Sequence, residues 1–415
     1  MKNHGLVKKV LAALMAVSMM AALTACGGSG SSGSADSAEA APAAEASAEA
    51  AGGVIKIGGS GPLTGGAAVY GTAVKDAAEL AVAEINAKGG QQFELRFEDD
   101  AHDAEKAVTA YGALKDWGMQ ISLCTVTSSP GAAAAPLYDE DNIFAITPSG
   151  SSLAVIYQDA DNAANPYGNI FQMCFTDPNQ GVASADYLAA HPDLGSKVAV
   201  IYKNDDNYSS GVFNKFKAES EVKGLEIVYD GTFDDSNASD FSVQLTKAQA
   251  AGADILFLPI YYEPASLILT QANQMGYAPT VFGIDGMDGI LTLEGFDTSL
   301  AEGVYLLTPF SADATDDLTK NFVENYKAKK DGEIPNQFAA DAYDCIYAIA
   351  QAVEAAGITA DMSASEICDK LVGQFTSMTF NGLTGQNVTW SETGEVSKSP
   401  KAVVIQGGVY VGVED

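Results

Sequence analysis

Residues 57–71 read IGGSGPLTGGAAVYG, six glycines and one tyrosine after a strand-like apolar start. A glycine-rich turn behind a first strand can cradle a phosphate. In GSGPLTG (59–65), however, the third glycine comes one position late for a dinucleotide fingerprint, and a proline interrupts the turn. The chain also has no Gly-Lys dipeptide and no GxSxG elbow. We therefore expect neither a nucleotide cofactor nor an enzymatic activity.

Apolar runs that suit strands alternate along the chain with patterns of helical period. The expected strands are 54–57, 93–98, 121–127, 143–147, then 198–202, 225–229, 255–260, 281–284 and 304–308, and the first expected helix is 74–87. This alternation predicts an α/β fold with two parallel sheets covered by helices. Further helices are expected at 316–330, 338–356 and 363–375, and a strand pair at 401–413. Three consecutive helices are too many to cover the second sheet alone.

The N-terminus has the pattern of an export signal. Lysines at positions 2, 8 and 9 precede an apolar run over 10–23 that is short for a membrane span. The run ends in LTACG, which resembles the lipobox of bacterial lipoproteins, so Cys26 is expected to carry a lipid; an ordinary secretory signal is the alternative. We expect a signal peptide over 1–25 and a flexible tether of small and acidic residues over 26–53.

The net charge argues against two classes of partner. It is −32, and −35 without the three leader lysines. So acidic an exported chain has no electrostatic attraction to nucleic acid or to an anionic lipid surface. Apart from the lipid on Cys26, the membrane is therefore not expected to be a ligand.

Cysteine and histidine offer little for metal or nucleophilic chemistry. Behind the leader only His102 and His191 remain, and four cysteines without a CxxC pair. The cysteines suit small buried apolar residues, although export permits a disulfide, for which Cys345 and Cys368 are the first pair to test. The cluster DDAHD (99–103) could bind a metal, but we favour a helix that Asp103 caps, with Glu105 in its first turn.

Seven motifs in order resemble the solute-binding proteins of branched-chain amino-acid ABC transporters. They are GPLTG with YG (61–65, 70–71), AEINAKGG (83–90), DD with Asp103 (99–103), ITPS (146–149), NYSSG (207–211), DF (240–241) and GIDG (283–286). The resemblance covers 54 to about 410 and implies the type I periplasmic-binding-protein fold, two doubly wound lobes joined by three crossings. It assigns 54–177 and 308–400 to lobe 1, and 178–307 and 401–415 to lobe 2.

The resemblance also implies how the polar ends of a zwitterionic ligand are bound. Ser128, at the start of a helix, matches the serine that binds the carboxylate, and Ser129 would cap that helix. Ser149 and Ser151 match residues that offer a carbonyl and a hydroxyl to the ligand. Asp285, between glycines, matches the acid that pairs with the ammonium; without that match it would be a turn-forming aspartate.

Apolar and aromatic residues are expected to form the remaining wall. Tyr208 and Tyr261 match tyrosines of lobe 2, and Tyr70 and Phe338 match aromatic residues of lobe 1, completed by Val126 and Thr127; alone, each would be read as an ordinary core residue. The glycine-rich loop is expected to deliver Tyr70 and to start the helix at Gly71. His102 and Thr127 stand where relatives pair two cysteines, so that disulfide is absent and the ligand can differ from leucine.

These residues predict a monomeric, lipid-anchored, extracytoplasmic receptor that captures a small amino acid and delivers it to an ABC permease. Receptors of the same fold for urea, a short amide or an aromatic acid are one alternative, and a sensor that is not coupled to transport is another.

Overall fold

The first sheet is built around the strand that opens the quoted stretch. The computed structural model describes residues 53–413, so the expected signal peptide, Cys26 and nearly all of the tether lie outside the described residues. The strand order is β2-β1-β3-β4-β7, all parallel. The strands are β1 (Val54–Gly61), β2 (Gln92–Asp99), β3 (Ile121–Thr125), β4 (Ala145–Thr147) and β7 (Ile170–Gln172). The short strand β7 and the hairpin β5 (Tyr157–Asp159) with β6 (Ala164–Pro166) were not predicted.

Helices cover this sheet and follow its strands in the predicted alternation. They are α1 (Ala68–Lys88), α2 (Ala104–Trp117) and α3 (Ser128–Glu140), with a short 3-10 turn η1 (Leu153–Val155). The prediction that α1 starts at Gly71 is wrong. Gly65 turns the chain with φ of 83°, the Ala68 N–H donates to its carbonyl, and Tyr70 therefore lies in the first helical turn. Gly71 is needed for packing instead, because a Cβ there would lie 2.1 Å from the Pro62 carbonyl oxygen.

The second sheet repeats this plan and adds an antiparallel edge. Its order is β14-β13-β12-β11-β10-β8-β9, parallel from β9 to β12 and antiparallel beyond. The strands are β8 (Lys197–Lys203), β9 (Glu226–Phe233), β10 (Ile255–Leu258), β11 (Thr280–Gly283), β12 (Tyr305–Thr308), β13 (Lys401–Gln406) and β14 (Val409–Gly412). Its helices are α4 (Asp177–Ala190), α5 (Asn207–Lys223), α6 (Ser242–Ala250) and α7 (Tyr262–Gln274), with the turns η2 (Asp285–Met287), η3 (Ile290–Thr292) and η4 (Thr298–Ala301).

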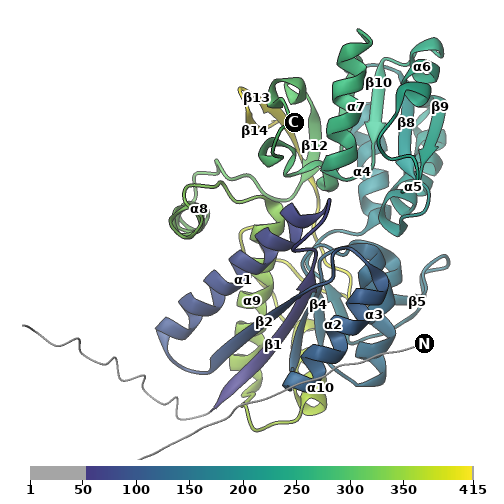
Figure 1. Ribbon diagram of the computed structural model, residues 1–415. Coiled ribbons are helices and arrows are strands. Elements are labelled where there is room, and N and C mark those ends of the chain that lie inside the picture. The colour runs from purple at the N-terminus through teal and green to yellow at the C-terminus, as the bar shows by residue number, and fades with distance from the viewer. Residues whose placement is uncertain (1–52, 414–415) are drawn as a thin grey trace, which may run out of the picture. The chain divides into compact units, whose positions relative to one another are not determined.

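The last three helices belong to the first lobe, as the number of helices had suggested. They are α8 (Asp317–Lys329), α9 (Gln337–Ala356) and α10 (Ala364–Phe375), and α9 runs beside α1 (Figure 1). The chain thus passes from β7 to the second lobe, returns after β12, and crosses again to β13, which pairs with β12. Two doubly wound lobes with three connecting segments are the arrangement that the resemblance implied. The exact residue limits given to the lobes stay a prediction.

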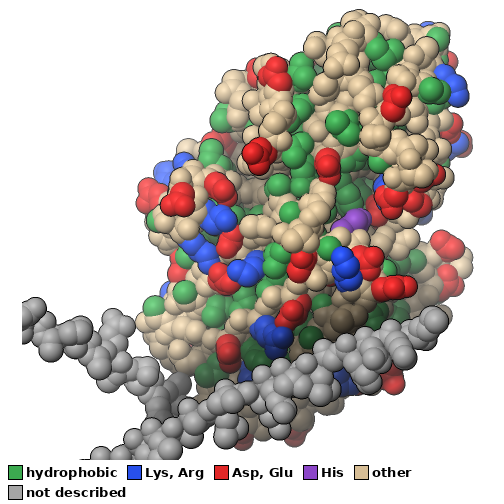
Figure 2. All heavy atoms as spheres, viewed as in Figure 1, with side chains coloured by type: hydrophobic (Ala, Val, Ile, Leu, Met, Phe, Trp, Pro, Cys, Tyr) green, Lys and Arg blue, Asp and Glu red, His purple; other side chains and the backbone are tan. Residues whose placement is uncertain are grey.

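Acidic side chains are spread over the visible face of the molecule with basic ones between them (Figure 2). Many of the basic side chains are paired. Lys329 and Lys330 at the end of α8, for example, contact Glu79 and Asp76 of α1 at 2.6 and 2.7 Å. Because these pairs are partly exposed, they contribute little stability, but they attach α8 to α1.

Candidate functional site

Loops at the carboxyl ends of six strands bring the predicted site residues together. Tyr70 follows β1, Ser128 follows β3 and Ser149 follows β4, whereas Tyr208, Tyr261 and Asp285 follow β8, β10 and β11 of the other sheet. In doubly wound sheets such loops converge where the strand order reverses, between β1 and β3 here and between β8 and β10. The topology therefore explains why residues more than 200 positions apart meet.

One small cavity is lined by nearly all of these residues. Its lining consists of Tyr70, Val126, Thr127, Ser128, Ser149, Tyr208, Tyr261, Asp285, Gly286 and Phe338. Of the residues predicted from the sequence, only Ser151 does not line it, and Gly286 was not singled out. The volume open to the centres of water-sized molecules is about 10 Å³, so the two lobes are closed tightly on one another.

The start of α3 provides hydrogen-bond donors on the first lobe. Thr127 is the N-cap residue in extended conformation, and the first N–H groups of a helix have no acceptor within it. Ser128 Oγ accepts a hydrogen bond from the Ser152 N–H at 3.2 Å, which leaves its own proton free to donate. Helix dipole, free N–H groups and hydroxyl together favour an anion such as a carboxylate.

The prediction that Ser129 caps α3 is wrong. Its hydroxyl donates to Asp206 Oδ1 of the other lobe at 3.2 Å, and no side chain caps this helix. Asp206 is itself the N-cap of α5, through a bond from the Ser209 N–H to Oδ2. Ser129 therefore links the starts of two helices on opposite lobes.

The loop behind β4 holds two of the predicted serines in different ways. Ser149 Oγ donates to the Val126 carbonyl oxygen at 2.6 Å, so its side chain fastens the loop to the neighbouring strand end. Ser151 is buried beside Asp177 at the start of α4, and its carbonyl oxygen accepts from the Asp177 N–H. Ser151 thus stands behind the cavity wall in this closed arrangement.

Asp285 is the buried acid of the cavity and comes from the second lobe. Oδ1 accepts from the Tyr208 hydroxyl at 2.6 Å and Oδ2 from the Gln180 amide at 3.1 Å. Burial nevertheless raises the pKa of this carboxyl to about 7, because these bonds only partly replace water. A cation placed against Asp285 would lower that pKa again and would be held by the ionised form.

Gly286 lies at a direct contact between the two lobes. Its carbonyl oxygen accepts a hydrogen bond from the Tyr70 hydroxyl, and that hydroxyl in turn accepts from the Tyr262 N–H at 3.2 Å. A Cβ at position 286 would lie 2.5 Å from Tyr208 Oη and 2.9 Å from the Ile260 carbonyl oxygen. Only glycine fits here, and the flanking glycines in the sequence were the available signal.

A second link between the lobes was missed by sequence reasoning. At the start of α9, the Gln337 N–H donates to Asp288 Oδ2 at 2.9 Å, and its side-chain amide donates to the Asp285 carbonyl oxygen at 3.1 Å. Burial raises the pKa of Asp288 to about 6. Nothing in the local sequence marks these residues, because their burial arises only when the lobes meet.

Aromatic rings form the remaining wall of the cavity. The Tyr70 ring lies 4.4 Å from Phe338 and 5.4 Å from Tyr261 between centroids, and Tyr261 stacks on Tyr208 at 5.0 Å. Where related proteins were expected to carry a disulfide, His102 Nδ1 and Thr127 Oγ1 form a hydrogen bond of 2.9 Å.

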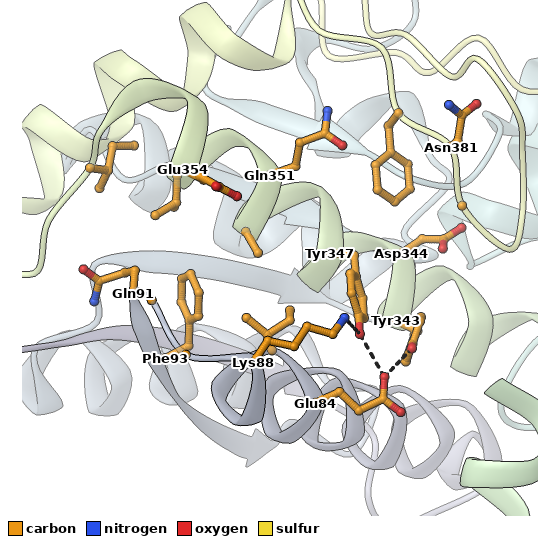
Figure 3. A pocket seen from close by; sticks show the side chains of 18 of the residues that line it. Glu84, Lys88, Gln91, Phe93, Tyr343, Asp344, Tyr347, Gln351, Glu354 and Asn381 are labelled. Atoms are coloured by element: carbon orange, nitrogen blue, oxygen red, sulfur yellow. Dashed lines mark hydrogen bonds between the residues drawn. The ribbon is translucent and has the colours of Figure 1, made fainter. Parts of the chain in front are cut away.

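A much larger groove lies elsewhere, between α1, α8 and α9. Its volume, measured in the same way as for the cavity, is about 970 Å³, and none of the ten predicted ligand contacts lines it. Figure 3 shows that four of its polar side chains bind one another: Tyr343 and Tyr347 of α9 donate to Glu84 of α1, and Lys88 donates to Tyr347. Size therefore does not make this groove the better candidate.

Other sequence expectations concern metals, cysteines and membrane spans. Asp103 caps α2 by accepting from the Lys106 N–H at 2.9 Å, as favoured over a metal site. Within residues 53–413 no group of three or more His, Cys, Asp or Glu side chains is placed to hold a metal ion. All four described cysteines are buried and free, so Cys345 and Cys368 are not joined. None of the helices within residues 53–413 combines the length and the apolar composition that a membrane span requires.

Comparisons with known proteins agree with this architecture. The family described as periplasmic binding protein matches residues 54–408. The Leu/Ile/Val-binding protein homolog 3 of Brucella melitensis is 30% identical over 375 residues, 88% of this chain and 95% of that protein. The leucine-, isoleucine-, valine-, threonine-, and alanine-binding protein of Pseudomonas aeruginosa is 27% identical over 354 residues, 84% of this chain and 89% of that protein.

The fold of this chain is also similar to that of a solved structure. The branched-chain amino acid transporter substrate binding protein LivJ of Streptococcus pneumoniae, in complex with isoleucine, superposes with a TM-score of 0.76 at 27% identity. The match covers 87% of this chain and 99% of that one. The chain described here therefore belongs to the periplasmic binding protein family, whose members bind solutes and are not enzymes.

Proposed function

We propose that this protein captures a small amino acid outside the cytoplasm and delivers it to an ABC importer. The observation that carries the proposal is the pairing of opposite chemistries across one cavity. Ser128 and the start of α3 offer donors from the first lobe, and Asp285 offers a buried acid from the second. An α-amino acid carries a carboxylate and an ammonium on one carbon, which is the ligand that such a pair can bind at both ends.

The lobes are expected to close over the ligand because Ser128 and Asp285 lie on different lobes. A ligand shifts an equilibrium only by binding one form better than the other. Because Ser128 and Asp285 sit on different lobes, a single amino acid can reach both only when the lobes are closed. Direct bonds from Tyr70 to Gly286 and from Gln337 to Asp285 also join the lobes in the closed form described here.

The names of the relatives support an amino-acid ligand and transport. The similar proteins of Brucella melitensis and Pseudomonas aeruginosa are named for binding leucine, isoleucine and valine, the latter also for threonine and alanine. The LivJ structure holds isoleucine and is named as part of a branched-chain amino acid transporter. We extend these properties to this chain together with a lipid anchor at Cys26, a monomeric state and a permease as partner.

Isothermal titration of the purified protein with each of the twenty amino acids tests the proposal. To remove any ligand that stays bound through purification, the protein is first unfolded in denaturant, dialysed and refolded. We expect at least one small amino acid to bind with a dissociation constant in the micromolar range or below. Absence of binding by all twenty to a correctly refolded sample would overturn the amino-acid ligand.

A further inference from the structure

One part of the cavity wall is more polar than a pocket for an aliphatic side chain requires. With Ser128 and Asp285 assigned to the two charged ends, the ligand side chain is left to Tyr70, Phe338, Val126, Tyr261 and Thr127. The Tyr70 hydroxyl is already engaged with Gly286 and Tyr262. Thr127 is 3% exposed, and its hydroxyl bonds to His102 Nδ1.

The backbone around His102 has positive φ angles. Ala101 and His102 have φ angles of 48° and 60°, which are uncommon for residues other than glycine. Two neighbouring carboxylates fix the turn: Asp99 Oδ1 accepts from the Ala101 N–H at 2.9 Å, and Asp100 Oδ1 accepts from the His102 N–H at 3.0 Å. Strained conformations of this kind persist where the surrounding structure imposes them.

The imidazole contacts residues of both lobes. It bonds to Thr127 of the first lobe and meets the ring of Tyr261 from the second edge to face, with centroids 5.3 Å apart and planes at 84°. Each of these two partners lines the cavity. His102 therefore positions the polar part of the wall without lining it.

The pair has hydrogen-bonding capacity to spare. A threonine hydroxyl can donate once and accept twice, and in the described chain Thr127 Oγ1 has the single bond to His102. If Nδ1 accepts, the hydroxyl can still accept from a ligand; if Nδ1 donates, the hydroxyl can still donate. An aliphatic ligand would leave this remaining capacity unused, whereas a hydroxyl or carboxamide on the ligand could pair with it.

We propose that the preferred ligand is a small amino acid whose side chain carries a hydroxyl or carboxamide, bound by Thr127 with His102 as its positioning residue. The proposal rests on the proposed function and adds the class of side chain. Threonine and valine form the test pair, because they have nearly the same shape and differ by a hydroxyl in place of a methyl group.

Titration calorimetry with threonine, valine and alanine separates the possible outcomes. For the wild type we expect threonine to bind at least tenfold more tightly than valine, since a site that hydrogen-bonds a hydroxyl rejects the analogue without it. In Thr127→Val the preference should vanish or reverse while alanine affinity stays within about threefold. Thr127→Ser, which keeps the hydroxyl, should keep the preference.

A control variant and a test of folding accompany these titrations. Thr109→Val changes an exposed threonine on α2 and should leave every affinity unchanged. Thermal unfolding of each variant shows that it is folded. Equal or tighter binding of valine by the wild type, or an unchanged preference in Thr127→Val, would overturn this inference alone. Failure of all twenty amino acids to bind would overturn the proposed function as well.

Discussion

The small cavity between the lobes and the large groove on the first lobe differ in how their polar groups are satisfied. In the groove, Glu84 accepts from two tyrosines and from Asn325, and it is partly exposed to water. In the cavity, Asp285 is buried, and its carboxyl has a pKa of about 7 despite two side-chain donors. A buried carboxyl that is costly to ionise, such as Asp285, gains stability when a cation binds beside it. A carboxylate that already accepts several hydrogen bonds and contacts water, such as Glu84, gains little.

The largest effect is expected from replacing the acid of the cavity. Asp285→Asn keeps the shape of the side chain but cannot compensate an ammonium, so the affinity for the amino acid should fall by at least 100-fold. Gln180 can accommodate the new amide, because its Oε1 has no hydrogen-bond partner among the described residues. The ligand-free variant should be as stable as the wild type or more stable at pH 8, since a buried charge is removed.

Calorimetry and thermal unfolding check both halves of this prediction. The matched control is Glu84→Gln, the same change of acid to amide in the groove. A Kd of Asp285→Asn within fivefold of the wild type would show that the acid does not pair with the ligand. A large loss of stability would show that its role is structural.

The pH dependence sharpens the comparison with a smaller effect. Between the ordinary pKa of 3.8 and the folded value of about 7, folded Asp285 keeps a proton that the unfolded chain has lost. The folded state then binds more protons at this carboxyl, so its contribution to the stability of the ligand-free protein should fall as pH rises through this range. Asp288 and Asp341, whose pKa values burial raises to about 6, act in the same direction.

Ligand affinity should change with the opposite sign. An ammonium binds the ionised carboxylate, so below pH 7 binding has to displace a proton, and the affinity should weaken by up to about tenfold per pH unit. Titrations at pH 6 and 8 should differ by about tenfold for the wild type and hardly at all for Asp285→Asn where its binding is measurable. A wild-type affinity that is constant over this range would contradict ionisation of Asp285 on binding.

Much of the fold was predictable, because each buried strand corresponds to a short run of apolar residues in the sequence. All nine expected parallel strands are present, and the residues behind their carboxyl ends meet because parallel strands end at one edge. Gln337 and Asp288 were not predictable, since two distant segments bury them only on lobe contact. The prediction for Ser129 was wrong for the same reason. A helix cap is a bond within a short stretch of chain, but the Ser129 hydroxyl instead bonds to Asp206 of the other lobe.

The smallest effect is expected in the groove. Glu84→Gln should weaken the bonds from Tyr343 and Tyr347 and lower the free energy of unfolding by about 0.5–1.5 kcal/mol. Ligand affinity should stay within twofold, because the groove shares none of the cavity's lining residues. Denaturant unfolding and calorimetry measure the two quantities on one sample. An affinity loss above fivefold would mean that the contact between α1 and α9 helps to stabilise the closed form. The large groove would then be energetically coupled to ligand binding in the cavity.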